Sequence, residues 1–176
     1  MRAGVSPPAF RRRGLVTPLS ETVMMTKIFV ALVALSLAAP AAAETETETE
    51  RAVKTLYEHF VAAQNARDAK AVRALMWDSP NFVWISDGKA FWGADRMIER
   101  MSAFQRSDVW EVMPDRGRAR VVEVSPVSAV LFQPLSLTLG PRADPRRIAF
   151  LVNVLCVRTP DGWRVGALHT TEENPN

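Results

Sequence analysis

The chain has 176 residues, a length that suffices for one domain with a buried core but hardly for two. Of these residues, 48% are hydrophobic and 23% are charged. Its formal net charge of +3 is concentrated at the beginning, because residues 1–43 hold five basic side chains and one acid. Residues 44–176 are left with 17 basic and 18 acidic side chains, a net charge of −1. This balance removes the electrostatic basis for nucleic-acid binding, and we expect no nucleic-acid partner.

Residues 24–43 have the pattern of a secretory signal peptide. Lys27 precedes an apolar run of 12 residues at positions 28–39, and small residues follow as far as Ala43. The run is too short for a membrane-spanning helix, which needs about 20 apolar residues. We therefore expect cleavage near Ala43, export to the periplasm or the medium, and no stable membrane anchor.

The segment 1–23 is a doubtful part of the protein, because it precedes a complete signal peptide that has its own methionines. We expect translation to begin at Met24 or Met25. The arginines at 11–13 leave a twin-arginine signal as a weaker alternative, since Glu21 and a long gap separate them from the apolar run.

Helical patterns dominate the first half of the remaining chain. Residues 44–50 form an acidic leader that favours the start of a helix, and the domain is expected to occupy 51–176. Asp68 is placed to cap a second helix, and Gly93 precedes a third. The first helix is indicated by side chains that recur at steps of three and four: Val53, Leu56, Tyr57, Phe60, Val61 and Gln64.

Strand patterns dominate the second half. A short hairpin is expected at 81–92, around the turn dipeptide Asp87-Gly88. Further strands are expected at 109–113, 118–124 and 127–139, followed by a hairpin at 147–158 and 163–171. Because strands follow helices and do not alternate with them, the order predicts an α+β fold with an antiparallel sheet.

The last hairpin combines two kinds of strand. Residues 148–157 are apolar at nearly every position, so both faces of this strand must be covered. Cys156, the single cysteine, lies in this run and is expected to be a buried hydrophobic residue. The returning strand alternates, which predicts that Trp163, Val165, Ala167 and His169 share one face and form the wall of a pocket.

The order of elements and three local motifs resemble the NTF2-like superfamily, in particular its SnoaL-like, DUF4440-type branch. The motifs are the helix junction 62–68, Gly93 before the third helix, and the ending 161–171, which is similar to the family's closing "GW…H-x-T" pattern. The resemblance implies a cone, with a curved antiparallel sheet wrapped around three N-terminal helices. It also implies a homodimer through the outer face of the sheet, which would cover the second face of the apolar strand.

The catalytic residues of ketosteroid isomerases, which share this fold, are not matched. Alignment from the helix junction places Phe60 at the position of the tyrosine and Trp84 at that of the carboxylate base. The third catalytic group falls near Asn153 or Val154, and neither is an acid. An isomerase mechanism is therefore not expected.

The sequence favours binding of an apolar or aromatic small molecule, without demonstrated catalysis. No metal and no cofactor is expected, since the chain has neither paired histidines nor a cysteine cluster. Two alternatives stay open: a small isomerase-, cyclase- or hydrolase-like enzyme with His169 as general base, and a structural dimerisation module whose pocket is filled by its own tryptophans. The candidate ligand-binding residues are Tyr57, Trp84, Trp92, Trp110, Asn153, Trp163 and His169.

Overall fold

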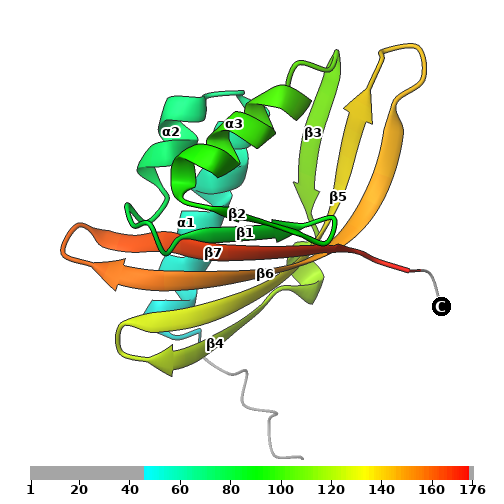
Figure 1. Cartoon of the computed structure of the whole chain (residues 1–176). Coiled ribbons are helices and arrows are strands. Elements are labelled where there is room, and N and C mark those ends of the chain that lie inside the picture. Colours follow the sequence, from blue (N-terminus) through cyan, green and yellow to red (C-terminus); the bar gives the residue numbers. More distant parts are fainter. Residues whose placement is uncertain (1–45, 175–176) are drawn as a thin grey trace, which may run out of the picture. The chain divides into compact units, whose positions relative to one another are not determined.

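The computed structural model of the protein describes residues 46–174. Within them, three α-helices pack on the concave side of a curved seven-stranded sheet (Figure 1). The predicted signal peptide, the segment before it and the first two residues of the acidic leader lie outside the described residues. No helix among residues 46–174 has the length and apolar character needed to cross a membrane.

The first helix, α1 (Glu48–Asn65), begins three residues before the predicted start at Arg51. Its first turn is made by the end of the acidic leader, because Thr47 caps the helix and accepts a hydrogen bond from the backbone N–H of Glu50 at 3.1 Å. Negative side chains at this end also interact favourably with the helix dipole. The predicted stripe of inward residues is confirmed, since every member of it is buried.

The two shorter helices have the predicted caps. The Asp68 side chain accepts from the Ala71 N–H at the start of α2 (Ala69–Ala74). Gly93, which has a positive φ of 81°, precedes α3 (Ala94–Phe104), and this conformation explains a glycine there. Met97 and Met101 are the buried residues in the middle of α3.

The α+β fold is confirmed, with one correction to the sheet. The strand order is β2-β1-β7-β6-β5-β3, with β4 also paired to β5, and all neighbours are antiparallel except β1 and β7, which are parallel. No tight turn joins β1 to β7, so nothing forces an antiparallel pairing there. The strands are β1 (Val83–Ser86), β2 (Lys89–Trp92), β3 (Val109–Pro114), β4 (Arg120–Ser125), β5 (Ser128–Gly140), β6 (Arg146–Thr159) and β7 (Gly162–Glu172).

A β-bulge at Gly166 divides β7 into two halves. Cys156 of β6 pairs with Val165, but the preceding residue Leu155 pairs with Ala167, so Gly166 is the extra residue. A Cβ atom at Gly166 would lie 3.1 Å from Cγ1 of Val157 and 3.3 Å from the Leu155 carbonyl oxygen. The close approach of β6 therefore requires a glycine at the bulge.

The bulge exchanges the two faces of β7 beyond it. Trp163 and Val165 pack against the core before the bulge, whereas Leu168 faces inward after it. His169 is exposed and pairs with the exposed Asn153 of β6. The prediction that Trp163 and His169 share one face is therefore wrong, because strict alternation holds only in a strand without an inserted residue.

One end of the interior is fully packed. Cys156 lies there with an exposed fraction of 0%, beside residues from α1 and three strands. Its predicted burial is confirmed, and burial raises the pKa of the Cys156 thiol to about 12. Other residues of this packed end with 0% exposure are Val53, Ala129, Leu131, Val154 and Val165.

Candidate functional site

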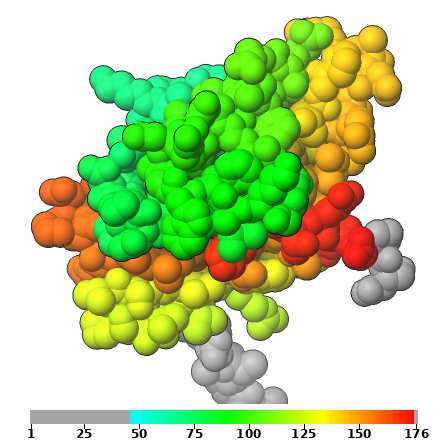
Figure 2. Space-filling model, in the orientation of Figure 1, coloured from blue at the N-terminus to red at the C-terminus, as the bar shows by residue number. Residues whose placement is uncertain are grey.

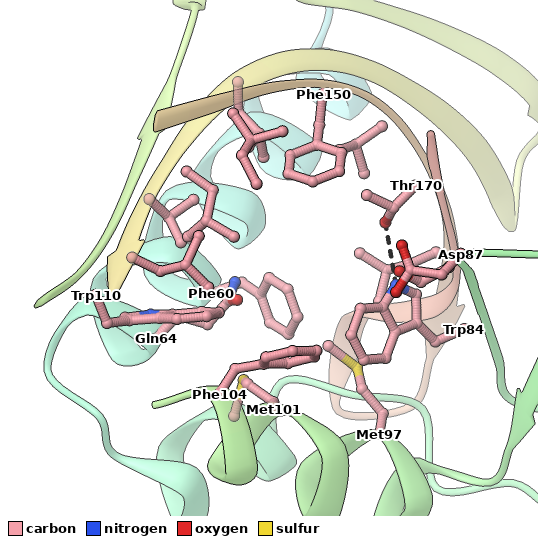
Figure 3. Close-up of a pocket in the computed structure, with 18 of the residues that line it drawn as sticks. Phe60, Gln64, Trp84, Asp87, Met97, Met101, Phe104, Trp110, Phe150 and Thr170 are labelled. Carbon is pink, nitrogen blue, oxygen red and sulfur yellow. Dashed lines mark hydrogen bonds between the residues drawn. The ribbon is translucent and has the colours of Figure 1, made fainter. Parts of the chain in front are cut away.

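The other end of the interior encloses a cavity of about 200 Å³ between the sheet and helices α1 and α3 (Figure 3). Every helix and strand that faces it contributes side chains, and most of these are apolar. The cavity is lined by Tyr57, Phe60, Gln64, Trp84, Ser86, Asp87, Met97, Met101, Phe104, Trp110, Val112, Leu135, Leu137, Leu139, Ile148, Phe150, Val152, Leu168 and Thr170.

The apolar wall follows from strand alternation on β3, β5 and β6. Leu135 and Leu137 alternate along β5 on the same face, and each lies opposite an inward residue of β6. The register pairs Leu135 with Phe150 and Leu137 with Ile148. These residues are only half-buried, because no side chain fills the space above them.

A polar group lies on the side of the cavity formed by α1 and β3. Gln64 is 9% exposed, and Figure 3 shows its side-chain amide on the same side as the indole of Trp110. Its backbone carbonyl accepts a hydrogen bond from Nε2 of Gln105 at 2.8 Å. Among the described residues, no hydrogen bond is recorded for the Gln64 side-chain amide, and the buried Nε1 of Trp110 has no acceptor.

Asn65 fixes this side of the cavity. Its Nδ2 donates to the Val112 carbonyl at 2.9 Å, and its Oδ1 accepts from the Val112 N–H at 2.7 Å. The side-chain amide thus pairs with β3 as another strand would. Since Gln64 and Trp110 lie one and two residues from this pair, it sets their relative position.

The opposite side of the cavity carries a second group of polar side chains. The indole N–H of Trp84 donates to Oγ1 of Thr170 at 3.0 Å. Ser86 is 7% exposed and also lines the cavity, while Asp87 in the β1–β2 turn lies at its margin. Figure 3 shows Trp84, Asp87 and Thr170 across the cavity from Gln64 and Trp110.

Arg100 of α3 joins that helix to the β1–β2 hairpin. Its guanidinium lies 5.6 Å, 4.5 Å and 4.8 Å from the ring centroids of Trp84, Phe91 and Phe104 and forms an ion pair with Asp87 at 2.5 Å. In Figure 2 the atoms of α3 and of the hairpin, both green, lie side by side on one face of the molecule. The charge of Asp87 is thus balanced by a cation that is itself held over aromatic rings.

Three of the predicted ligand-binding residues line the cavity: Tyr57, Trp84 and Trp110. Tyr57 is 3% exposed, and burial raises the pKa of its phenol far above the usual range. The Tyr57 hydroxyl therefore stays protonated under any physiological condition.

The other four predicted residues do not line it. Trp163 packs against the core on the other side of the bulge. His169 and Asn153 lie on the outer face of the sheet. His169, the candidate general base, is therefore not in the cavity. Trp92 is 61% exposed on the edge strand β2. It pairs with Val83 and lies on the opposite face of the hairpin from Trp84, which lines the cavity.

Several lining residues were absent from the prediction. Gln64 was visible in the sequence as a polar side chain within the apolar stripe of α1, a pattern typical of a buried polar group with a function. Thr170 had no such signal, because its inward orientation depends on the bulge. Met97, Met101 and Phe104 recur at helical spacing, a pattern that is equally typical of an ordinary hydrophobic core.

This geometry bears on the alternative of a filled pocket and on metal binding. The cavity is present beside Trp84 and Trp110, so tryptophans do not fill the interior of the described domain. Within residues 46–174, no group of three or more histidine, cysteine, aspartate or glutamate side chains is arranged to hold a metal ion.

Solved structures share the arrangement described above. A protein from Caulobacter vibrioides with a cystatin-like fold matches at a TM-score of 0.63 and 19% identity, over 73% of this chain and 92% of that one. A ketosteroid isomerase-like protein from Erwinia carotovora atroseptica matches at a TM-score of 0.60 and 19% identity, over 73% and 99% of the two chains. A nuclear transport factor 2 (NTF2-like) superfamily protein from Salmonella enterica serovar Typhimurium matches at 0.63 and 14% identity, over 72% and 92%.

These similarities establish the fold of the chain: it is the NTF2-like fold, as the sequence predicted. No protein-family model and no curated protein sequence matches the chain. Membership of the SnoaL-like, DUF4440-type branch stays a prediction.

Proposed function

We propose that this domain binds a small, largely apolar molecule in the cavity between the sheet and helices α1 and α3. The observation that carries the proposal is the lining itself, in which a few separate polar groups interrupt a wall of aliphatic and aromatic side chains. Such a wall favours an apolar ligand, and the polar groups orient it. The volume of about 200 Å³ is below the roughly 300–1,000 Å³ of sites for drug-sized ligands, which favours a small molecule.

Binding without catalysis is the simpler proposal for this lining. Asp87 is the charged side chain among the lining residues, and Arg100 already neutralises it. A general base needs a free carboxylate or imidazole within hydrogen-bonding reach of the substrate. His169 cannot serve in this cavity, because it lies on the outer face of the sheet.

A fluorescent probe tests the proposal. We expect the uncharged dye N-phenyl-1-naphthylamine to bind and its fluorescence to rise on titration with the protein. The variant Leu137→Trp should abolish the rise by filling the cavity, while Ser136→Trp, one residue away and on the outer face, should leave it unchanged. A wild-type protein that does not bind the dye, or a Leu137→Trp variant that binds it equally well, would contradict a ligand site in the cavity.

We also propose that the protein is exported, on the basis of the sequence pattern at 24–43. The expected mature chain begins at Glu44. Mass spectrometry of the protein isolated from its own host should give this N-terminus, and an intact N-terminus in the cytosolic fraction would contradict export. The same measurement under native conditions would reveal a retained ligand.

We further propose a homodimer through the outer face of the sheet. Leu155 of β6 is 37% exposed there, and on the same face Val122 of β4 is 61% exposed. A second copy would bury this apolar surface. Sedimentation should give a dimer mass that the variant Val122→Glu reduces to that of a monomer, whereas a wild-type monomer at all concentrations would contradict the dimer.

A further inference from the structure

The Gln64 amide is a polar group of the cavity lining for which the described residues supply no partner. It is nine-tenths buried on a helix whose other inward residues are apolar or aromatic, apart from the phenol of Tyr57. No described residue forms a hydrogen bond with its side chain, although an amide offers two donors and an acceptor. Because Gln64 lines the cavity, these donors and this acceptor are available to a ligand that enters it.

The position of Gln64 is also fixed by its surroundings. The Gln105 amide holds the backbone carbonyl of Gln64, and the neighbouring Asn65 is paired at both ends of its amide with Val112. The side chain therefore enters the cavity from a rigid backbone, on the side where Trp110 forms the wall (Figure 3). A preorganised hydrogen-bonding group loses little conformational entropy on binding.

The charges around the cavity limit what the amide can bind. The lining contains no lysine, arginine or histidine, and its carboxylate, Asp87, is paired with Arg100 across the cavity from Gln64. A ligand carboxylate placed beside Gln64 would be desolvated without a counter-charge, which is unfavourable. An uncharged oxygen suffers no such penalty.

Building on the proposed function, we infer that the ligand is an uncharged, largely apolar molecule with a carbonyl or hydroxyl oxygen, and that the Gln64 amide binds this oxygen. The remainder of the molecule contacts the leucine and phenylalanine wall of β5 and β6. Gln64 then determines specificity between ligands of similar shape.

Three naphthalene compounds that differ in one substituent test this inference: 2-acetylnaphthalene, 2-isopropylnaphthalene and 2-naphthoate. Their affinities are measured by quenching of tryptophan fluorescence, since Trp84 and Trp110 line the cavity. We expect the ketone to bind about three- to tenfold more tightly than the hydrocarbon, which is the ratio that one net hydrogen bond supplies, and the carboxylate to bind most weakly.

The variant Gln64→Met has nearly the same shape without the amide. It should remove the preference for the ketone and leave the affinity for the hydrocarbon unchanged. Asn153→Leu is the matched control, because it removes an amide from the outer face of the sheet, outside the cavity lining, and should preserve the preference. Thermal unfolding of each variant verifies that it folds.

The outcomes separate the inference from the proposed function. Equal binding of ketone and hydrocarbon, a preference that persists in Gln64→Met, or tightest binding of the carboxylate would each overturn the inference while ligand binding stands. If none of the three compounds binds although N-phenyl-1-naphthylamine does, the inference also fails. If no compound and no dye binds, the proposed function itself is wrong.

Discussion

The two ends of the interior are built from the same strands yet differ in how they are filled. Leu131 and Leu137 lie on one face of β5, and Leu131 is fully buried while Leu137 borders the cavity and is only half-buried. Alternation along a strand thus decides which side chains face inward. Whether another element covers them depends on where the helices lie.

The helices explain the difference. The N-terminal half of α1 brings Val53 and Leu56 against the sheet at the packed end. At the other end α3 packs against β1 and β2, and its side chains close the cavity opposite β5 and β6. The space enclosed between them is the candidate site.

The largest expected effect is at the packed end. Leu131→Ala should lower the free energy of unfolding by about 2–5 kcal/mol, because it creates a void among close-packed neighbours. Leu137→Ala removes the same atoms from a wall that already borders the cavity. It should therefore lower the free energy of unfolding by clearly less than Leu131→Ala does. Urea unfolding of both variants measures the difference, and equal losses would contradict the division of the interior into two ends.

The bulge is the next test, because it sets which residues of β7 face the cavity. Gly166→Ala should destabilise the protein by about 1–3 kcal/mol, since the added Cβ would press on Val157 and on the Leu155 carbonyl. Gly117→Ala is the matched control, as its nearest neighbour, Oδ1 of Asp115, lies at 3.5 Å. A Gly166→Ala variant as stable as the control would show that β6 does not approach as closely as described.

Asn65 tests the rigidity of the cavity end. Asn65→Ala leaves the N–H and carbonyl of the buried Val112 without their partners. The free energy of unfolding should fall by about 1–2 kcal/mol. The exposed Asn81, whose side chain has no recorded hydrogen bond, should tolerate alanine within about 0.5 kcal/mol. Chemical denaturation compares the two, and equal small effects would mean that the Asn65 pair does not stabilise this end.

The smallest effect is expected at the margin of the cavity. Asp87→Asn removes the charge facing Arg100, and because Asp87 is 63% exposed the loss of stability should stay below about 1 kcal/mol. A double-mutant cycle with Arg100→Met isolates the ion pair. A coupling above that range would show that the pair is more strongly shielded from water than its exposure indicates.

Most of the fold could be predicted from local patterns. The stripe on α1, the Asp68 cap, the Asp87-Gly88 turn and the final hairpin all follow from residue type and spacing, and the structure has each of them. The parallel pairing of β1 with β7 could not be predicted, because it joins segments far apart in the chain with no turn to indicate it.

The candidate site was less predictable, for two physical reasons. Tryptophan occurs in cavity walls, in cores and on exposed edge strands. Residue type alone therefore could not show that Trp110 lines the cavity while Trp163 packs in the core and Trp92 is exposed. The inserted residue in β7 then reversed the orientation of every side chain after it. His169 and Thr170 exchanged the roles that alternation assigned to them.

The bulge keeps a titratable side chain out of the cavity. Gly166 is the extra residue, so a chain without it would keep the same pairs with β6 and would still direct Thr170 inward and His169 outward. If Gly166 stayed but were forced into regular pairing, the register beyond it would shift by one residue and His169 would face the interior. The single unpaired residue in β7 therefore excludes an imidazole from a chamber whose carboxylate, Asp87, is already paired with Arg100.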